Sequence, residues 1–171
     1  PAAYDLTELQ RDANKKYGYS AKQTLSLMQS LYETHKPLTY PRTDSRYITK
    51  DVAATLPERL RAIAIGPYKD AANAVLRSKP VQTKYIVNDA KVTDHHAIIP
   101  TMVAGETDIN ALPAGEREII KLIAKQVLRA VCDSFRYRET VAVISCGDRT
   151  FTAKGKTVQT AKKVIGVKFL F

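Results

Sequence analysis

Apolar residues recur at helical spacing near the start of the chain, and the pattern predicts two short helices. The first is expected to begin after Asp5, because Asp-Leu-Thr-Glu is a capping-box sequence, and to end at Gly18. The second is expected to begin in the same way after Ser20 and to be closed by Pro37. Their apolar stripes are Leu6, Leu9, Ala13 and Tyr17 in the first helix and, facing a core, Leu25, Met28, Leu31 and Tyr32 in the second.

Helical patterns continue through the middle of the chain around one long stretch with little periodicity. Residues 49–65 predict a helix with a break or restart at Pro57, and Pro67 at a first-turn position starts another. Residues 79–112 hold few periodic signals, and a loop of that length inside a domain is usually functional or mobile. The strongest helix follows Pro113, and its core-facing residues are Ile119, Ile120, Ile123, Val127 and Val131.

The last part of the chain is β-rich instead of helical. Residues 140–145 and 150–153 favour strands on either side of a Gly147-Asp148 turn, and residues 164–171 are also strand-like. Without partner strands, such a segment is expected to have unpaired edges and to be poorly ordered or self-associating.

The expected fold is mainly α with a β-rich C-terminal segment. Two short helices followed by extended sequence are typical of a winged-helix unit, so residues 1–135 are interpreted as a helical, winged-helix-like domain. Residues 136–171 are interpreted as part of a separate β-rich region. The 171 residues, 44% of them hydrophobic, suffice to bury a core. The chain starts at Pro1 without a methionine, and we expect a fragment of a longer protein.

The net charge of +10 indicates a polyanionic partner such as a nucleic acid. Residues 136–171 hold eight basic and two acidic residues, so most of the excess positive charge lies outside the segments with candidate chemistry.

No apolar run approaches the ~20 residues of a membrane span, and we expect a cytoplasmic protein without a membrane partner.

Tyr40 is the residue that most constrains function, because it lies in extended sequence with an arginine two residues on. Pro41 disfavours helical backbone at Tyr40, and in extended backbone Tyr40 and Arg42 face the same side. A tyrosine hydroxyl is a weak nucleophile unless charge is stabilised as it attacks. The Arg42 guanidinium can hold two phosphate oxygens, and Asp44 and Ser45 can orient the guanidinium or the hydroxyl. A phosphate diester would suit this pair.

Spacing alone leaves structural roles open for these residues. The chain contains nine tyrosines, most of them expected to be structural, and Thr-Asp-Ser is common in turns and caps. The adjacent His95 and His96 make a poor pair of ligands for one metal ion, and each taken alone is more often structural.

Three motifs in order along roughly the first 100 residues resemble the type IA DNA topoisomerases. They are YDLTELQR at residues 4–11, TYPRTDSRY at 39–47 with Tyr32-Glu33 before it, and DHHAIIPT at 94–101. The later segment FTAKGK at residues 151–156 resembles the strand that follows in the same family. Within the family, the likeness is closer to the bacterial topoisomerase III group.

The resemblance implies roles for the candidate residues. Tyr40 matches the nucleophilic tyrosine, which attacks a single-strand phosphodiester and becomes linked to the 5′ phosphate while the 3′ hydroxyl leaves. Arg42 matches the arginine that stabilises the transition state, and His95 matches the histidine that contacts the scissile region, with His96 the weaker candidate. Asp44 matches a motif acid whose role is local orientation. The residues expected to contact DNA are Arg42, Asp44, Ser45, Arg46, His95 and His96.

The chain also departs from the family. The family's Mg2+ site is an Asp-x-Asp-x-Glu cluster in a separate N-terminal domain, which also supplies a lysine and a glutamate. No Asp-x-Asp pair occurs in this chain, so no metal ligand is assigned here, and the missing N-terminal domain is an expected partner. Residues 136–171 look like the start of the family's β-rich arch, although the usual Gly-Trp is absent.

The resemblance implies that the parent protein cleaves one DNA strand through a phosphotyrosine, passes a strand and reseals the gap without ATP. Its expected substrates are single-stranded DNA and negatively supercoiled or catenated DNA in the nucleoid, and the isolated chain is expected to be inactive. An alternative is a non-catalytic winged-helix DNA-binding module. Tyrosine recombinases require several arginines around a histidine and a C-terminal tyrosine, and relaxases require a three-histidine metal cluster; neither pattern is present.

Overall fold

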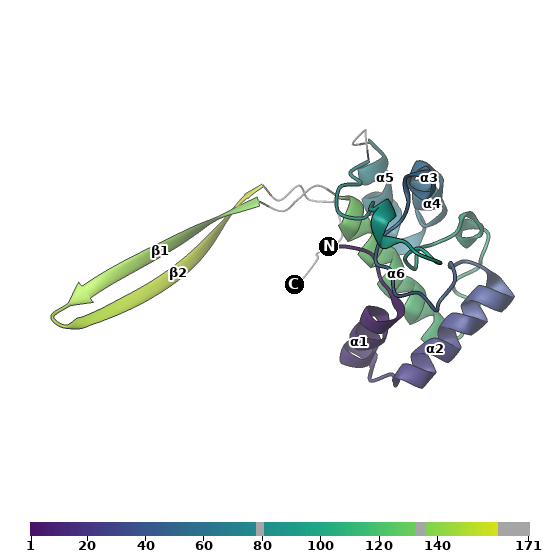
Figure 1. The fold of residues 1–171 in the computed structure, drawn as a ribbon, viewed down its shortest axis with the longest axis horizontal. Coiled ribbons are helices and arrows are strands. Elements are labelled where there is room, and N and C mark those ends of the chain that lie inside the picture. Colours follow the sequence, from purple (N-terminus) through teal and green to yellow (C-terminus); the bar gives the residue numbers. More distant parts are fainter. Residues whose placement is uncertain (78–80, 133–135, 161–171) are drawn as a thin grey trace. The chain divides into compact units, whose positions relative to one another are not determined.

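The computed structural model describes residues 1–77, 81–132 and 136–160, and these belong to two units (Figure 1). The first unit, within Pro1–Cys132, carries the helices, and the second, within Asp133–Lys163, carries a β-hairpin. The prediction of a mainly helical region and a β-rich segment is confirmed. The predicted boundary at residue 135 falls outside the described residues, so the division at that position stays a prediction.

Both N-terminal helices begin at a side-chain cap, as the sequence predicts. The Asp5 carboxylate accepts a hydrogen bond from the Glu8 N–H at 2.7 Å and starts α1 (Leu6–Tyr17). Gly18, at φ +73°, ends α1 in the left-handed conformation that glycine adopts without strain. The hydroxyl of Ser20 caps α2 (Ala21–Ser30) through the Gln23 N–H at 3.1 Å.

A π-helical turn, η1 (Leu31–His35), continues directly from α2. It ends at Lys36, whose φ of +56° is unusual for a residue other than glycine and turns the chain toward Tyr40. Tyr32 on this turn is 38% exposed, so the prediction that Tyr32 faces a core is wrong. The apolar spacing predicts one continuous α-helix, whereas the wider π turn changes the face on which each side chain lies.

Short helices fill the middle of the first unit. They are α3 (Lys50–Ala54), α4 (Leu56–Ala62), the 3-10 turn η2 (Gly66–Tyr68), α5 (Lys69–Arg77), and the 3-10 turns η3 (Asp89–Lys91) and η4 (Met102–Gly105). Pro57 lies in the first turn of α4, where a missing N–H is harmless, which confirms the predicted restart. None of the helices in the described part of the chain has the length and apolar character needed to cross a lipid bilayer.

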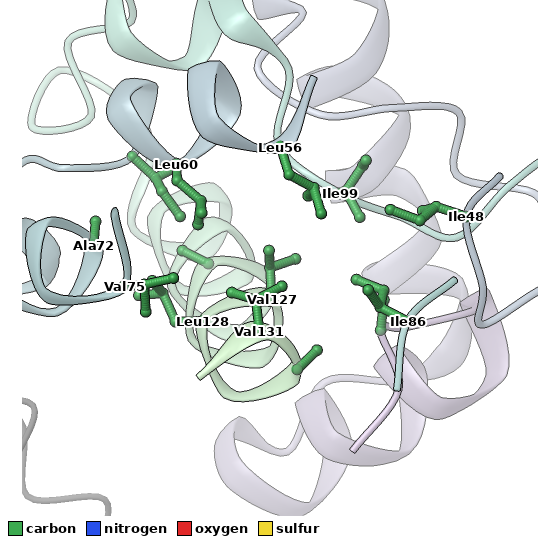
Figure 2. Packing of buried hydrophobic residues seen from close by; sticks show 14 of the residues in the cluster. Ile48, Leu56, Leu60, Ala72, Val75, Ile86, Ile99, Val127, Leu128 and Val131 are labelled. Carbon is green, nitrogen blue, oxygen red and sulfur yellow. The ribbon is translucent and has the colours of Figure 1, made fainter. Parts of the chain in front are cut away.

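The long helix α6 (Ala114–Val131) contributes to both hydrophobic clusters of the first unit, and its predicted core face is buried. Ile119 and Ile120, in its first half, belong to one cluster with residues of α1 and α2. Val127 and Val131, in its second half, belong to the other cluster with residues of α4 and α5, as Figure 2 shows around Leu60. Since a fully buried aliphatic side chain contributes roughly 1.5–3 kcal/mol, α6 is a major source of stability for this unit.

Extended segments connect the helices of the first unit through isolated backbone bridges. These bridges join Tyr4 to Ile98, Leu38 to Pro100 and Ile48 to Val87. The described residues of this unit include no strand longer than such a bridge, so the winged-helix detail stays a prediction. The segment 97–99 lies between the two clusters, because Ala97 and Ile99 belong to one and Ile98 to the other.

The second unit is an antiparallel hairpin of β1 (Arg136–Cys146) and β2 (Arg149–Thr160). Its two-residue turn begins at Gly147, whose φ of +57° suits a tight hairpin and confirms the predicted turn. Val143 pairs with Thr152 and Ile144 with Phe151, and these strands extend beyond the residues that the sequence predicted. The strand expected at residues 164–171 lies outside the described residues.

Candidate functional site

The backbone around Tyr40 alternates buried and exposed side chains, as extended geometry requires. Pro41 and Thr43 are buried, whereas Arg42 and Asp44 are exposed and Tyr40 is half-buried. The period of two places Arg42 and Asp44 on the outer side of the segment. The prediction of an extended Tyr40 segment with an accessible arginine two residues on is consistent with this pattern.

The tyrosine segment is held against residues 97–101 by backbone hydrogen bonds. The Thr39 N–H donates to the Ile99 carbonyl at 3.0 Å, and the Thr101 N–H donates to the Pro37 carbonyl at 2.8 Å. Leu38, between them, is 1% exposed and belongs to the same hydrophobic cluster as Ile98. The segment that presents Tyr40 is therefore anchored on a packed core.

His95 lies beside Tyr40, although the two residues are far apart in the sequence. Their ring centroids are 4.3 Å apart, with the ring planes at 39°. His95 is exposed on its loop. His96 is turned differently, since its Nδ1 lies 2.8 Å from the Ala97 carbonyl oxygen. Of the two predicted histidines, the structure brings His95 to the tyrosine.

Tyr32 is a third ring at this site, a position that the sequence pattern does not predict. Its ring contacts that of Tyr40 edge-on, with centroids 5.5 Å apart and planes at 79°. Such T-shaped pairs are favourable because the positive edge of one ring meets the negative face of the other. Tyr40 thus has an aromatic neighbour from η1 and another from the loop that carries His95.

Arg42 and Asp44 do not contact each other as the sequence suggested. Neither side chain has a hydrogen bond or an ion pair within residues 1–77, 81–132 and 136–160. The predicted orientation of the Arg42 guanidinium by Asp44 is therefore not present in this structure. The donors of Arg42 remain directed to solvent, where an incoming anion can accept from them.

Ser45 lies inside the protein, and its contact with DNA stays a prediction. Its side chain is buried, and its hydroxyl donates to the Lys91 carbonyl at 2.7 Å and accepts from the Tyr47 N–H at 3.2 Å. Arg46 is half-buried, and its Nε donates to the Ala3 carbonyl at 3.4 Å. The serine completes the turn after Tyr40, because its hydroxyl supplies bonds that the bent backbone cannot make.

Arg59 holds the segment that follows His95 and His96. The sequence analysis does not predict this role. From α4, its Nη1 donates to the Pro100 carbonyl at 2.8 Å and its Nε to the Thr55 hydroxyl at 2.8 Å. Burial lowers the pKa of the Arg59 guanidinium from its ordinary value, although an arginine remains charged at any working pH. This arginine bonds to the protein rather than to a ligand.

A metal site is not formed by the part of the chain that the structure describes. Within it, no three histidine, cysteine or acidic side chains gather closely enough to hold an ion. The acids near Tyr40 therefore do not fit a Mg2+ ligand set by themselves.

Comparisons with known proteins show the family to which this chain is similar. The sequence pattern of the DNA topoisomerase family matches residues 1–162. DNA topoisomerase 3 of Bacillus thuringiensis (strain Al Hakam) is 52% identical over 158 residues, which are 92% of this chain and 21% of that protein. DNA topoisomerase 3 of Bacillus subtilis (strain 168) is 49% identical over 160 residues, which are 94% of this chain and 22% of that protein.

Solved structures give the same result for the fold. Full-length topoisomerase I of Thermotoga maritima superposes with a TM-score of 0.64 at 24% identity, covering 92% of this chain and 25% of that one. The chain spans about a fifth of the length of the curated relatives that it matches, 21% and 22% in the two cases above. On the family match and the identity to these relatives, the chain belongs to the DNA topoisomerase family, among the type IA enzymes that include bacterial topoisomerase III.

Proposed function

We propose that this chain supplies the nucleophile with which a type IA DNA topoisomerase cuts one DNA strand. The observation that carries the proposal is the Tyr40 phenol in ring contact with His95 at 4.3 Å, next to the exposed guanidinium of Arg42. Family membership supports DNA as the substrate, and the net charge of +10 supports contact with a polyanion.

In the proposed step, the Tyr40 oxygen forms a bond to the phosphorus of a single-strand phosphodiester. The bond from phosphorus to the 3′ oxygen breaks, the phenolic proton is released, and the 3′ oxygen takes up a proton and leaves as a hydroxyl. Arg42 binds the non-bridging oxygens through two N–H groups and stabilises the added charge. His95 contacts the scissile region at the ring of Tyr40.

Resealing is the reverse of this step in our proposal. The phosphotyrosine bond conserves the energy of the phosphodiester, so no ATP is required. Strand passage between cleavage and resealing belongs to the whole protein, of which this chain is about a fifth by comparison with its relatives. Mg2+ would be bound by residues outside this chain, in an N-terminal metal-binding domain, and we propose that the isolated chain is inactive.

The proposed DNA contacts are made by exposed and half-exposed groups. Arg42 and His95 are exposed, and Arg46 and His96 are partly exposed next to them. Asp44 is exposed but negative, so its proposed part is to orient a neighbouring group on DNA binding rather than to bind phosphate. We place this activity on single-stranded regions of supercoiled or catenated DNA in the cytoplasm, with residues 1–135 acting as a winged-helix-like domain.

The substitution Tyr40→Phe in the full-length protein tests the proposal. It removes one hydroxyl and keeps both ring contacts, so DNA binding should be retained while covalent capture is lost. The assay incubates the protein with labelled single-stranded oligonucleotide and Mg2+, denatures it, and measures labelled protein on a gel. A tyrosyl-DNA adduct from the Phe variant would refute the assignment of Tyr40.

A non-catalytic DNA-binding module is the second candidate function, favoured only by the basic charge. The same assay separates the two candidates, since a binding module would retain DNA without forming an adduct even in the wild-type full-length protein. The exposed position of Arg42 beside Tyr40 favours the catalytic candidate.

A further inference from the structure

Pro41 interrupts the pairing between the tyrosine segment and the histidine segment. Before Tyr40, backbone hydrogen bonds join the two, as between Thr39 and Ile99 at 3.0 Å. Pro41 has no N–H and cannot continue this pattern. Among the described residues, no backbone hydrogen bond joins residues 40–45 to residues 94–96. The position of His95 relative to Tyr40 must therefore be fixed by other contacts.

The hydroxyl of Thr43 provides such a contact. Its Oγ1 donates to the His95 carbonyl at 3.0 Å, across 52 positions of sequence, and accepts from the Ser45 N–H at 3.1 Å. A hydroxyl has one donor and two acceptor positions, so it can make both bonds at once. The Thr43 residue is 7% exposed, so water cannot readily replace it in this role.

His95 has few other anchors. Its ring is exposed and lies against Tyr40, and Thr43 is its one side-chain hydrogen-bond partner among the described residues. The nearest bonds to other segments lie at Lys91 before it, whose carbonyl accepts from the Ser45 hydroxyl at 2.7 Å, and at Ala97 after it, whose N–H donates to the Tyr47 carbonyl at 2.8 Å. A small movement of the His95 backbone would therefore move its ring relative to the Tyr40 hydroxyl.

We infer that Thr43 is a positioning residue for strand cleavage, whose hydroxyl holds His95 in place against the nucleophile. The inference rests on the proposed function, because it assigns a purpose to the distance between Tyr40 and His95. A displaced catalytic group lowers a rate without touching the substrate, since reacting groups must lie close to their productive geometry. Thr43 acts through His95 and does not contact DNA itself.

The substitution Thr43→Val removes the hydroxyl and keeps the shape of the side chain. Thr43→Ser keeps the hydroxyl and loses one methyl group. Thr24→Val is the matched control, because Thr24 is also buried and its hydroxyl also donates to a backbone carbonyl, that of Ser20 at 3.0 Å, but inside α2. All three are made in the full-length protein, and the single-turnover rate of adduct formation is measured with excess enzyme on labelled single-stranded oligonucleotide with Mg2+.

We expect Thr43→Val to slow adduct formation roughly tenfold to a hundredfold, of the order that a misplaced group costs. The rate for Thr43→Ser should stay within about twofold of wild type, because serine keeps the hydrogen bond. The rate for Thr24→Val should do the same, because Thr24 lies away from the site. A folded Thr43→Ser protein with a tenfold lower rate would overturn the inference even if Thr43→Val does not fold. A wild-type rate for Thr43→Val would overturn it as well.

Coupling to His95 separates positioning from a general structural role. In a His95→Ala background, Thr43→Val should change the rate by less than about twofold, because the group that it positions is already gone. Equal losses in both backgrounds would show that Thr43 acts independently of His95 and would overturn the inference. Tyr40→Phe is measured in parallel. If this variant still forms the adduct, the proposed function fails. If it forms no adduct and the effects of Thr43→Val and His95→Ala are additive, only the role of Thr43 is refuted.

Discussion

Replacing Arg59 by methionine should destabilise the helical unit, whereas the same change at Arg61 should not. Both arginines lie on α4, and each substitution removes one positive charge. Arg59 is half-buried and bonds to Pro100 and Thr55, whereas Arg61 is exposed and its side chain has no hydrogen bond or ion pair among the described residues. Methionine keeps much of the aliphatic stem, so the comparison isolates the guanidinium.

The magnitude follows from the bonds that are lost. Pro100 is buried, and its carbonyl has no other hydrogen-bond partner in the described part of the chain, so leaving it unpaired costs ~1–3 kcal/mol. Loss of the bond to Thr55 adds ~0.5–1.5 kcal/mol. Because Arg59 is only half-buried, water restores part of this, and we expect ~2 kcal/mol in total.

The assays are urea unfolding, which gives the free energy of unfolding, and thermal unfolding, both on the protein of residues 1–171 with either substitution. A loss of ~2 kcal/mol in a protein of this size corresponds to a melting temperature lower by about 4–8 °C. Arg61→Met should remain within ~0.5 kcal/mol of wild type. Equal stability of the two variants would refute the role of Arg59 as a structural support and would make it available as a DNA contact.

Three further predictions concern the site and the whole chain. Arg42→Lys in the full-length protein should slow cleavage by at least about tenfold, because an ammonium group cannot make the two-pronged contact to phosphate; an unchanged single-turnover rate would contradict this. His95→Ala should reduce cleavage more than His96→Ala, since the His95 ring lies 4.3 Å from that of Tyr40, and equal losses would disagree with the geometry. The isolated chain should bind single-stranded DNA weakly in a filter assay, and its affinity should fall as salt rises because phosphate contacts release counterions. It should form no tyrosyl-DNA adduct in the presence of Mg2+, and a robust adduct would mean that the chain is self-sufficient.

Local sequence signals were sufficient for the elements whose ends are chemically marked. Asp5 marks the start of α1 and Gly18 marks its end, and Pro57 lies in the first turn of α4. Gly147 makes the hairpin turn at the predicted place. Caps, prolines and turn glycines act within about one turn of backbone, so their effect does not depend on the rest of the chain. The extended, alternating backbone after Tyr40 is a local consequence of the same kind.

Contacts between distant segments were decided only by the tertiary structure. The apolar spacing after α2 predicted a buried Tyr32, but the π turn places it beside Tyr40. The motif predicts that Ser45 contacts DNA. In the structure, the hydroxyl of Ser45 donates a hydrogen bond to the carbonyl of Lys91, 46 positions away.

The sequence by itself thus determined the helices, the hairpin turn and, through its motifs, the family and the identity of the candidate nucleophile. The motif favoured His95 over His96, but only the tertiary structure decided that the His95 ring lies against Tyr40, because the aperiodic stretch around His95 carries no local signal for its path. That path is set where alternate side chains of residues 97–99 enter two hydrophobic clusters and where the Thr43 hydroxyl reaches the His95 carbonyl. Such a placement depends on how the helices pack around α6, and packing is a property of the whole unit rather than of any one segment.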